Sequence, residues 1–167
     1  LVDNVHSIVA FKAVDAEGKG CDVTGTVYSS SGEMVTMFRS AHLGMGSFAL
    51  KPVSGSGYYA IMKGPDNTEI RSELPESFSS GATLSASVLN DKELSVIVRT
   101  NDQTLPLIKG KDIILAVSVR KELVKTIIIR INSLLNNLTR PTEDFPEGIV
   151  MLTFMTAENL PISERLI

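Results

Sequence analysis

Two residues whose side chains can form a nucleophile–base pair occur early in the chain: Cys21, the only cysteine, and His42, one of two histidines. Cys21 follows the expected turn Gly18-Lys19-Gly20, and His42 falls in a different expected loop. Residue types alone do not establish a hydrogen-bonded pair, so we interpret them as a half-buried strand residue and a loop histidine. No Gly-x-Ser-x-Gly segment marks a serine nucleophile either. We predict no catalytic residue and a protein that is not an enzyme.

Metal ligands are sparse in the sequence. His6 and His42 are far apart, whereas a structural zinc site needs a clustered set of Cys and His. Asp15, Glu17 and Asp22 flank a turn and could hold a weakly bound calcium ion, but they lack the spacing of a calcium-binding hand. Acidic residues and glycine also favour plain turns. We predict no metal and no cofactor, and leave a weak calcium site in the loops as an open alternative.

A glycine-rich segment, Gly44-Met45-Gly46-Ser47-Phe48, is the next candidate, since such loops can hold phosphates. It lacks the Gly-Lys-Ser/Thr ending and the third glycine of nucleotide-binding loops, and no helix is expected after it. Glycine permits a positive φ where a strand begins, which would let Met45 and Phe48 reach the core. We predict that this segment determines local shape or mediates an interaction, and that it comprises His42, Gly44, Met45, Gly46 and Phe48.

We expect the segments that carry these residues to be strands. Segments rich in β-branched and apolar residues recur at about one per ten residues, a spacing typical of β-sandwiches. No stretch keeps a 3.6-residue apolar period, so long helices and parallel β-α-β units are not expected. Residues 134–138 fit either one helical turn or a strand end. The expected strands are 5–13, 23–28, 34–40, 47–51, 58–62, 83–89, 94–99, 113–119, 125–131, 149–155 and 162–166.

A change of composition suggests a domain boundary. Residues 63–69 contain turn formers and charges and little that could be buried. We predict an all-β chain of two immunoglobulin-like, antiparallel β-sandwich domains in tandem. The first would span residues 1–63, the linker 64–72 and the second domain 73–167.

Bulk properties exclude several classes of function. The chain has 167 residues, of which 43% are hydrophobic, and a net charge of −3. That charge offers no basic excess to hold a phosphate backbone, so we expect no nucleic acid partner. The apolar-rich residues 105–131 are interrupted by Lys109, Lys111 and Asp112, so we expect no membrane insertion. Because the first residues are Leu1-Val2-Asp3-Asn4, we read the chain as a fragment of a longer protein.

Several spaced motifs carry a resemblance to a known family. The carrying motifs are Asn4-x-x-x-x-Val9-Ala10-Phe11-Lys12-Ala13-x-Asp15-x-x-Gly18-x-Gly20, Val23-x-Gly25-x-Val27, Gly32-x-x-Val35, His42-x-Gly44-Met45-Gly46-x-Phe48, Leu74-Pro75, Gly81-x-x-Leu84 and Phe145-Pro146-x-Gly148-Ile149. On these motifs, the first part of the chain resembles the macroglobulin-like β-sandwich modules of exported bacterial (Bacteroidetes-type) envelope proteins, which are related in fold to the repeats of α-2-macroglobulins. The segments from Leu74 onward look, less specifically, like the module that often follows.

The resemblance implies a non-catalytic structural or protein-interaction module of a larger protein, located in the periplasm or at the outer membrane or cell surface. Implied partners are other domains of that protein or envelope proteins. The family's thioester motif is absent, since Cys21 lies in Gly20-Cys21-Asp22-Val23. Family modules begin with a strand before Asn4 that is missing here, so an exposed edge near Val5–Lys12 and an edge-strand dimer are expected. The alternative is glycan or peptide binding by the inter-strand loops around 42–48 and 73–80.

Overall fold

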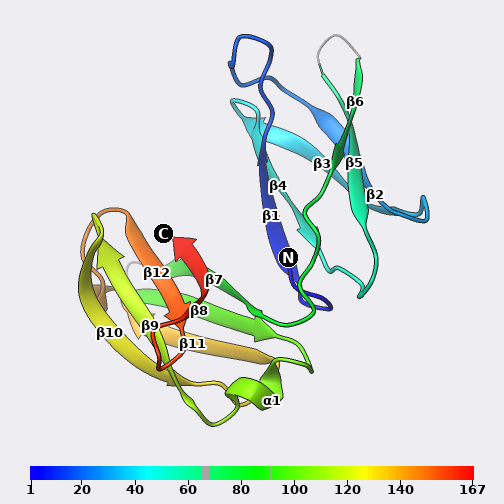
Figure 1. The fold of residues 1–167 in the computed structure, drawn as a ribbon. Coiled ribbons are helices and arrows are strands. Elements are labelled where there is room, and N and C mark those ends of the chain that lie inside the picture. The colour runs from blue at the N-terminus through cyan, green and yellow to red at the C-terminus, as the bar shows by residue number, and fades with distance from the viewer. Residues whose placement is uncertain (65–67, 91) are drawn as a thin grey trace. The chain divides into compact units, whose positions relative to one another are not determined.

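A computed structural model describes residues 1–64, 68–90 and 92–167. Almost every regular element in these ranges is a β-strand, and the strands pair antiparallel, which confirms the all-β class (Figure 1). The exceptions are the four-residue helix α1 (Leu105–Ile108) and a single 3-10 turn, Thr142–Asp144. No helix within the described ranges is long and apolar enough to cross a membrane.

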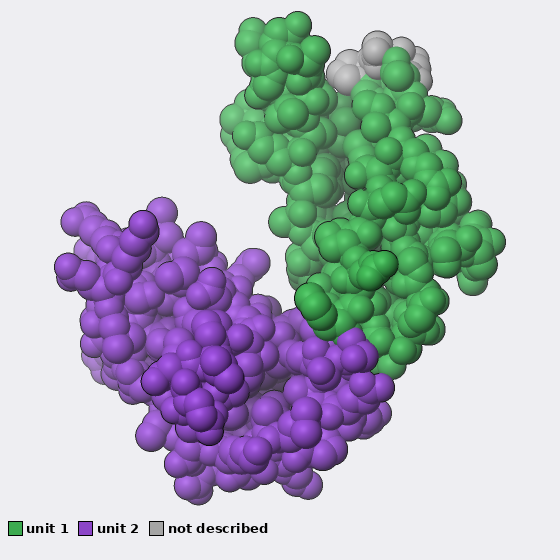
Figure 2. Space-filling view, viewed as in Figure 1, with its two compact units in different colours: residues 1, 3–78 green, residues 2, 79–167 purple. Residues whose placement is uncertain are grey.

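The chain divides into two compact units, residues 1 and 3–78 and residues 2 and 79–167 (Figure 2). The division therefore follows Phe78, later than the expected boundary. Residues 69–72 of the expected linker belong to strand β6 (Glu69–Glu73), which pairs with its neighbour in the first unit. All five residues of β6 are exposed, so this segment has no apolar pattern that would reveal a strand. Residues 65–67 of that linker, and Asp91 between the expected strands 83–89 and 94–99, lie outside the described residues.

The first unit contains one sheet with the strand order β1-β4-β3-β2-β5-β6 (Figure 1). Its other strands are β1 (Ser7–Lys12), β2 (Thr24–Ser29), β3 (Met34–His42), β4 (Met45–Leu50) and β5 (Tyr58–Lys63). β1 and β6 are the two edge strands of this sheet.

Three phenylalanines form the centre of the first unit's core. The ring centroids of Phe11 and Phe38 are 4.8 Å apart, and those of Phe38 and Phe48 are 5.3 Å apart. Val27 and Leu50 are almost fully buried in the same cluster. Since β1, β2, β3 and β4 all contribute to this cluster, one face of the sheet encloses a single core.

The second unit contains two sheets, with strand orders β10-β9-β12-β13 and β11-β8-β7. Side chains from both sheets, including Val96, Val117, Leu152 and Phe154, form one buried cluster. Residues 134–138, ambiguous in the sequence, lie in or just before β11, which pairs with β8. The strands are β7 (Ala82–Asn90), β8 (Glu93–Thr100), β9 (Asp112–Val119), β10 (Glu122–Arg130), β11 (Leu135–Pro141), β12 (Val150–Met155) and β13 (Pro161–Leu166).

Candidate functional site

The segment 42–48 forms the hairpin between β3 and β4. His42 pairs with Met45, and the two residues between them, Leu43 and Gly44, have φ values of 48° and 75°. Positive φ at both central positions is typical of the type I′ turn, whose twist matches that of paired strands. Residue 43 therefore takes a left-handed conformation that costs a leucine energy, and glycine takes it at residue 44 without that cost.

Gly44 is required by contact as well as by φ. A Cβ atom at this position would lie 2.1 Å from the Ala13 carbonyl oxygen and 2.9 Å from the Cys21 amide nitrogen. The same backbones are hydrogen-bonded, since the Ala13 amide donates to the Gly44 carbonyl oxygen at 2.8 Å. Gly20 is equally constrained, because its Cβ would lie 2.0 Å from the Leu43 carbonyl oxygen. The hairpin tip and the loop after β1 thus pack backbone against backbone.

Gly46 makes room for the aromatic core. A Cβ there would lie 2.5 Å from the Cζ atom of Phe11, so the Phe11 ring lies across β4 at this position. Phe48 is buried in the same cluster, but Met45 is 45% exposed. The expectation that Met45 and Phe48 both reach the core was therefore wrong for Met45. Residues separated by an odd number along a strand point to opposite faces.

The other candidate residues of this region are Cys21, His42 and Asp15. No hydrogen bond joins the half-buried Cys21 to the exposed His42, and neither side chain has a hydrogen-bond partner in the described part of the chain. The Asp15 carboxylate accepts hydrogen bonds from the amides of Glu17 and Lys19, at 3.1 and 2.8 Å, and so closes its own turn. Among the described residues, no group of three or more His, Cys, Asp and Glu could hold a metal ion.

The edge strand β1 presents unpaired backbone groups. Its residues pair only with β4 among the described strands, in an unbroken register from Ser7 opposite Leu50 to Lys12 opposite Met45. The Ala13 amide donates to the Gly44 carbonyl oxygen, which continues the same register. Hydrogen-bonding direction alternates from one residue to the next along an antiparallel strand, so the odd-numbered residues of β1 bond to β4. The N–H and C=O groups of Ile8, Ala10 and Lys12 therefore point away from the sheet.

The other edge strands carry features that discourage pairing, and β1 does not. The backbone groups of Glu69, Arg71 and Glu73 point to the free side of β6, because the Leu74 amide donates to the Tyr58 carbonyl oxygen on the paired side. β7 and β10 have register irregularities, and β11 and β13 contain prolines at an end. Charges, bulges and prolines are the usual protection of sheet edges. β1 has neither bulge nor proline, and its single charge, Lys12, lies at its end.

An apolar cavity of about 210 Å³ lies beside β1 in the first unit. Val9 and Phe11 line it from β1, and Met62, Leu74 and Pro75 line it from β5 and the end of β6. Val9 and Phe11 are only half-buried, although they point toward the core. The family resemblance led us to expect a free edge near Val5–Lys12, but nothing in the sequence pointed to the cavity, because its two walls lie more than fifty positions apart.

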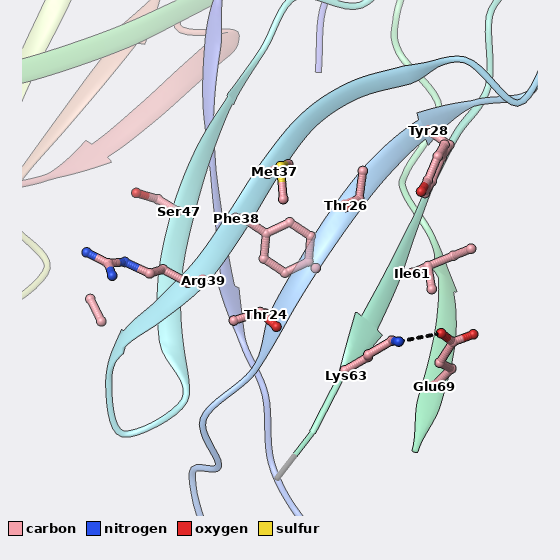
Figure 3. A pocket seen from close by; sticks show the side chains of 12 residues that line it. Thr24, Thr26, Tyr28, Met37, Phe38, Arg39, Ser47, Ile61, Lys63 and Glu69 are labelled. Atoms are coloured by element: carbon pink, nitrogen blue, oxygen red, sulfur yellow. Dashed lines mark ion pairs between the residues drawn. The ribbon is translucent and has the colours of Figure 1, made fainter. Parts of the chain in front are cut away.

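A broader, shallow hollow lies over β2, β3 and β5 (Figure 3). It has a volume of about 820 Å³ and is lined by both polar and apolar side chains. Met37 stands above it and is 72% exposed, and a 3.0 Å ion pair joins Lys63 and Glu69 at one side. Tyr28, another lining residue, stacks on Tyr59 with 5.6 Å between ring centroids. Sequence reasoning missed this surface, since its residues alternate with core positions on three strands.

A scan against protein-family models and a search of curated proteins returned no match to this chain.

Proposed function

We propose that this chain is a non-catalytic structural or protein-interaction module of a larger exported cell-envelope protein, and that it binds other polypeptides through the free edge of β1. The observation that carries the proposal is the row of outward backbone groups at Ile8, Ala10 and Lys12. Such a row can hydrogen-bond an added strand, which is a recurrent mode of peptide recognition.

The fold that this proposal assumes is a pair of β-sandwich domains of immunoglobulin-like or macroglobulin-like type. Support comes from the cores, since the second unit's cluster draws on both of its sheets and the first unit's cluster draws on the five strands from β1 to β5. The resemblance of the motifs between Asn4 and Phe48 supports the macroglobulin-like assignment. Residence in the periplasm or at the outer membrane or cell surface rests on that same resemblance.

The proposal is tested by presenting a library of short displayed peptides to the full chain and to two proline variants. Ala10→Pro removes an outward N–H of β1, and Arg71→Pro makes the equivalent change on the charged edge of β6. We expect peptides that bind the parent chain and the Arg71→Pro variant but lose binding to Ala10→Pro. An absence of binders, or binders that ignore Ala10→Pro, would contradict the proposal.

The non-catalytic part of the proposal has its own test. A hydrolase screen without added cofactors should detect no turnover. Turnover that persists in the purified chain and disappears in His42→Ala would make the protein an enzyme and overturn this part.

The second candidate function is glycan or peptide binding by surface features other than the β1 edge. The hollow of Figure 3 favours it, because Tyr28 offers an aromatic face and Arg39 a cation within one concave surface. A glycan array with the parent chain and a Tyr28→Ala variant tests this candidate. An array without hits would remove its carbohydrate version.

A further inference from the structure

We infer that the polypeptide which pairs with β1 is the β1 strand of a second copy of this chain, in an antiparallel dimer whose two-fold axis passes through Ala10. The inference rests on the proposed function, because it uses the same free edge. It goes further by naming the occupant and the register.

Hydrogen-bond direction restricts the register. Two β1 strands can exchange hydrogen bonds only where outward groups meet outward groups, so an even-numbered residue must lie opposite another even-numbered residue. With Ala10 on the axis, Ile8 lies opposite Lys12 of the second copy, and Ala10 lies opposite its own equivalent. Every outward N–H and C=O of β1 then has a partner. A shift of one residue would set outward groups against groups already bonded to β4.

The side chains also match in this register. Val9 lies opposite Phe11 of the second copy, in a pair without direct hydrogen bonds, where side chains approach most closely. Both residues line the 210 Å³ cavity and are half-buried in one copy. Pairing would therefore place apolar side chains of the second copy at the margin of that cavity. The two-fold axis makes this contact reciprocal, so it forms twice in each dimer.

On the solvent-exposed face of the two paired β1 strands, no like charges lie opposite each other. Ile8 is 64% exposed, and its neighbour in the pair would be the apolar stem of Lys12. The two Lys12 ammonium groups do not lie opposite each other. A register shifted by two residues, with Val9 on the axis, would place Phe11 opposite Ser7 and Lys12 opposite His6. Of these two registers, only the Ala10 register pairs apolar with apolar on the core side. A shift the other way, with Phe11 on the axis, would set Ile8 opposite Val14, beyond the end of β1.

The absence of protection distinguishes β1 from the other edges of the described sheets. In β6, the second edge of the same sheet, the outward backbone groups belong to Glu69, Arg71 and Glu73, and pairing with a copy of itself would set like charges opposite each other. β1 offers a regular, uncharged centre from Ser7 to Phe11. A closed two-fold pair covers this edge completely, whereas a one-sided contact would leave another edge exposed.

The test is sedimentation equilibrium of the full chain over a wide concentration range, with charge variants on the proposed axis. Ala10→Lys and Ala10→Asp each place like charges directly opposite one another, and we expect each to raise the dimer dissociation constant about fivefold or more. An equimolar mixture of the two should form a heterodimer at least as tight as the parent dimer. Ala49→Lys and Ala49→Asp are matched controls, because Ala49 is exposed on β4 beside Ile8 but away from the edge.

The outcomes separate the inference from the proposed function. A dimer that weakens in both single Ala10 variants, recovers on mixing and ignores the Ala49 changes supports the inference. A chain that stays monomeric, or a dimer that is insensitive to Ala10 charges, overturns it. A synthetic peptide of residues 6–14 then serves as a probe: if it slows amide exchange at Ile8, Ala10 and Lys12 of a monomeric chain, the edge still binds strands and the proposed function stands. If it does not, both fail.

Discussion

At the scale of single residues, some glycines of the first unit are required by close backbone contact and others only by their positive φ. Gly44 and Gly55 have the same φ of 75°, but only Gly44 has backbone atoms where a Cβ would stand. We expect Gly55→Ala to lower the free energy of unfolding by about 1 kcal/mol, the cost of a left-handed residue. Gly44→Ala should cost about 3 kcal/mol, because the Ala13 carbonyl must also move. Thermal denaturation of the two variants measures the difference, and equal losses would show that the hairpin tip is not packed as described.

The ionisation of Asp3 makes the stability of the first unit depend on pH. Hydroxyl hydrogen bonds from Ser77 and Ser54 hold the pKa of its carboxyl group below the ordinary value of 3.8. A lowered pKa stabilises the folded state above that ordinary value, and the contribution disappears as pH falls from it toward the folded-state value. Asp3→Asn and Ser77→Ala should therefore both flatten the acid side of the stability profile. Urea unfolding at a series of acidic pH values measures this, and an unchanged slope in both variants would contradict the assignment.

Residue roles were only partly accessible from sequence. The pattern His42-x-Gly44-Met45-Gly46-x-Phe48 indicated a glycine-dependent change of direction, because glycine and its flanking apolar residues define a turn locally. It could not indicate that Gly44 meets Ala13 and Cys21, since that contact depends on long-range pairing of β1 with β4. The expectation that Met45 reaches the core overlooked strand alternation. Met45 and Phe48 are three positions apart on one strand, so they point to opposite faces.

At the scale of elements, β1 has one side that is hydrogen-bonded to β4 and one side that is free. Proline substitutions on the two sides should differ in their effect on stability. Val9→Pro removes an N–H that points to β4 and should cost about 3 kcal/mol or more. Ala10→Pro removes an N–H that points outward, so we expect a loss of about 1 kcal/mol. Thermal denaturation of the dilute chain compares the two. Equal destabilisation would mean that the ladder direction assigned to β1 is wrong.

Most strands could be located from the sequence by their apolar residues, including β13, which has no buried residue. β2, β3, β8, β9 and β12 each lie close to their expected positions. Residues 69–72 of β6 were assigned to a linker because Glu69-Ile70-Arg71-Ser72 has a single apolar residue. The strand conformation of β6 comes from pairing with β5, where Arg71 also lies 3.7 Å from the Tyr59 ring centroid.

At the scale of the whole molecule, the described residues form two separate cores, one in each unit. Phe154 is fully buried in the second core, and Phe154→Ala should cost that unit about 3–5 kcal/mol. Because no residue of the first core belongs to the second, we expect faster amide exchange in β8, β9 and β12 with unchanged exchange in β2 and β3. Equal acceleration in both units would show that they unfold as one cooperative body.

The free edge of β1, able to accept another strand, should be detectable in the monomeric chain. The measurement is amide hydrogen exchange of the full chain, at a dilution where sedimentation verifies a monomer. We predict slow exchange at Val9 and Phe11, whose N–H groups bond to β4, and fast exchange at Ile8, Ala10 and Lys12. Equal, strong protection of all five amides in the monomer would show that the edge is already covered and would contradict the account.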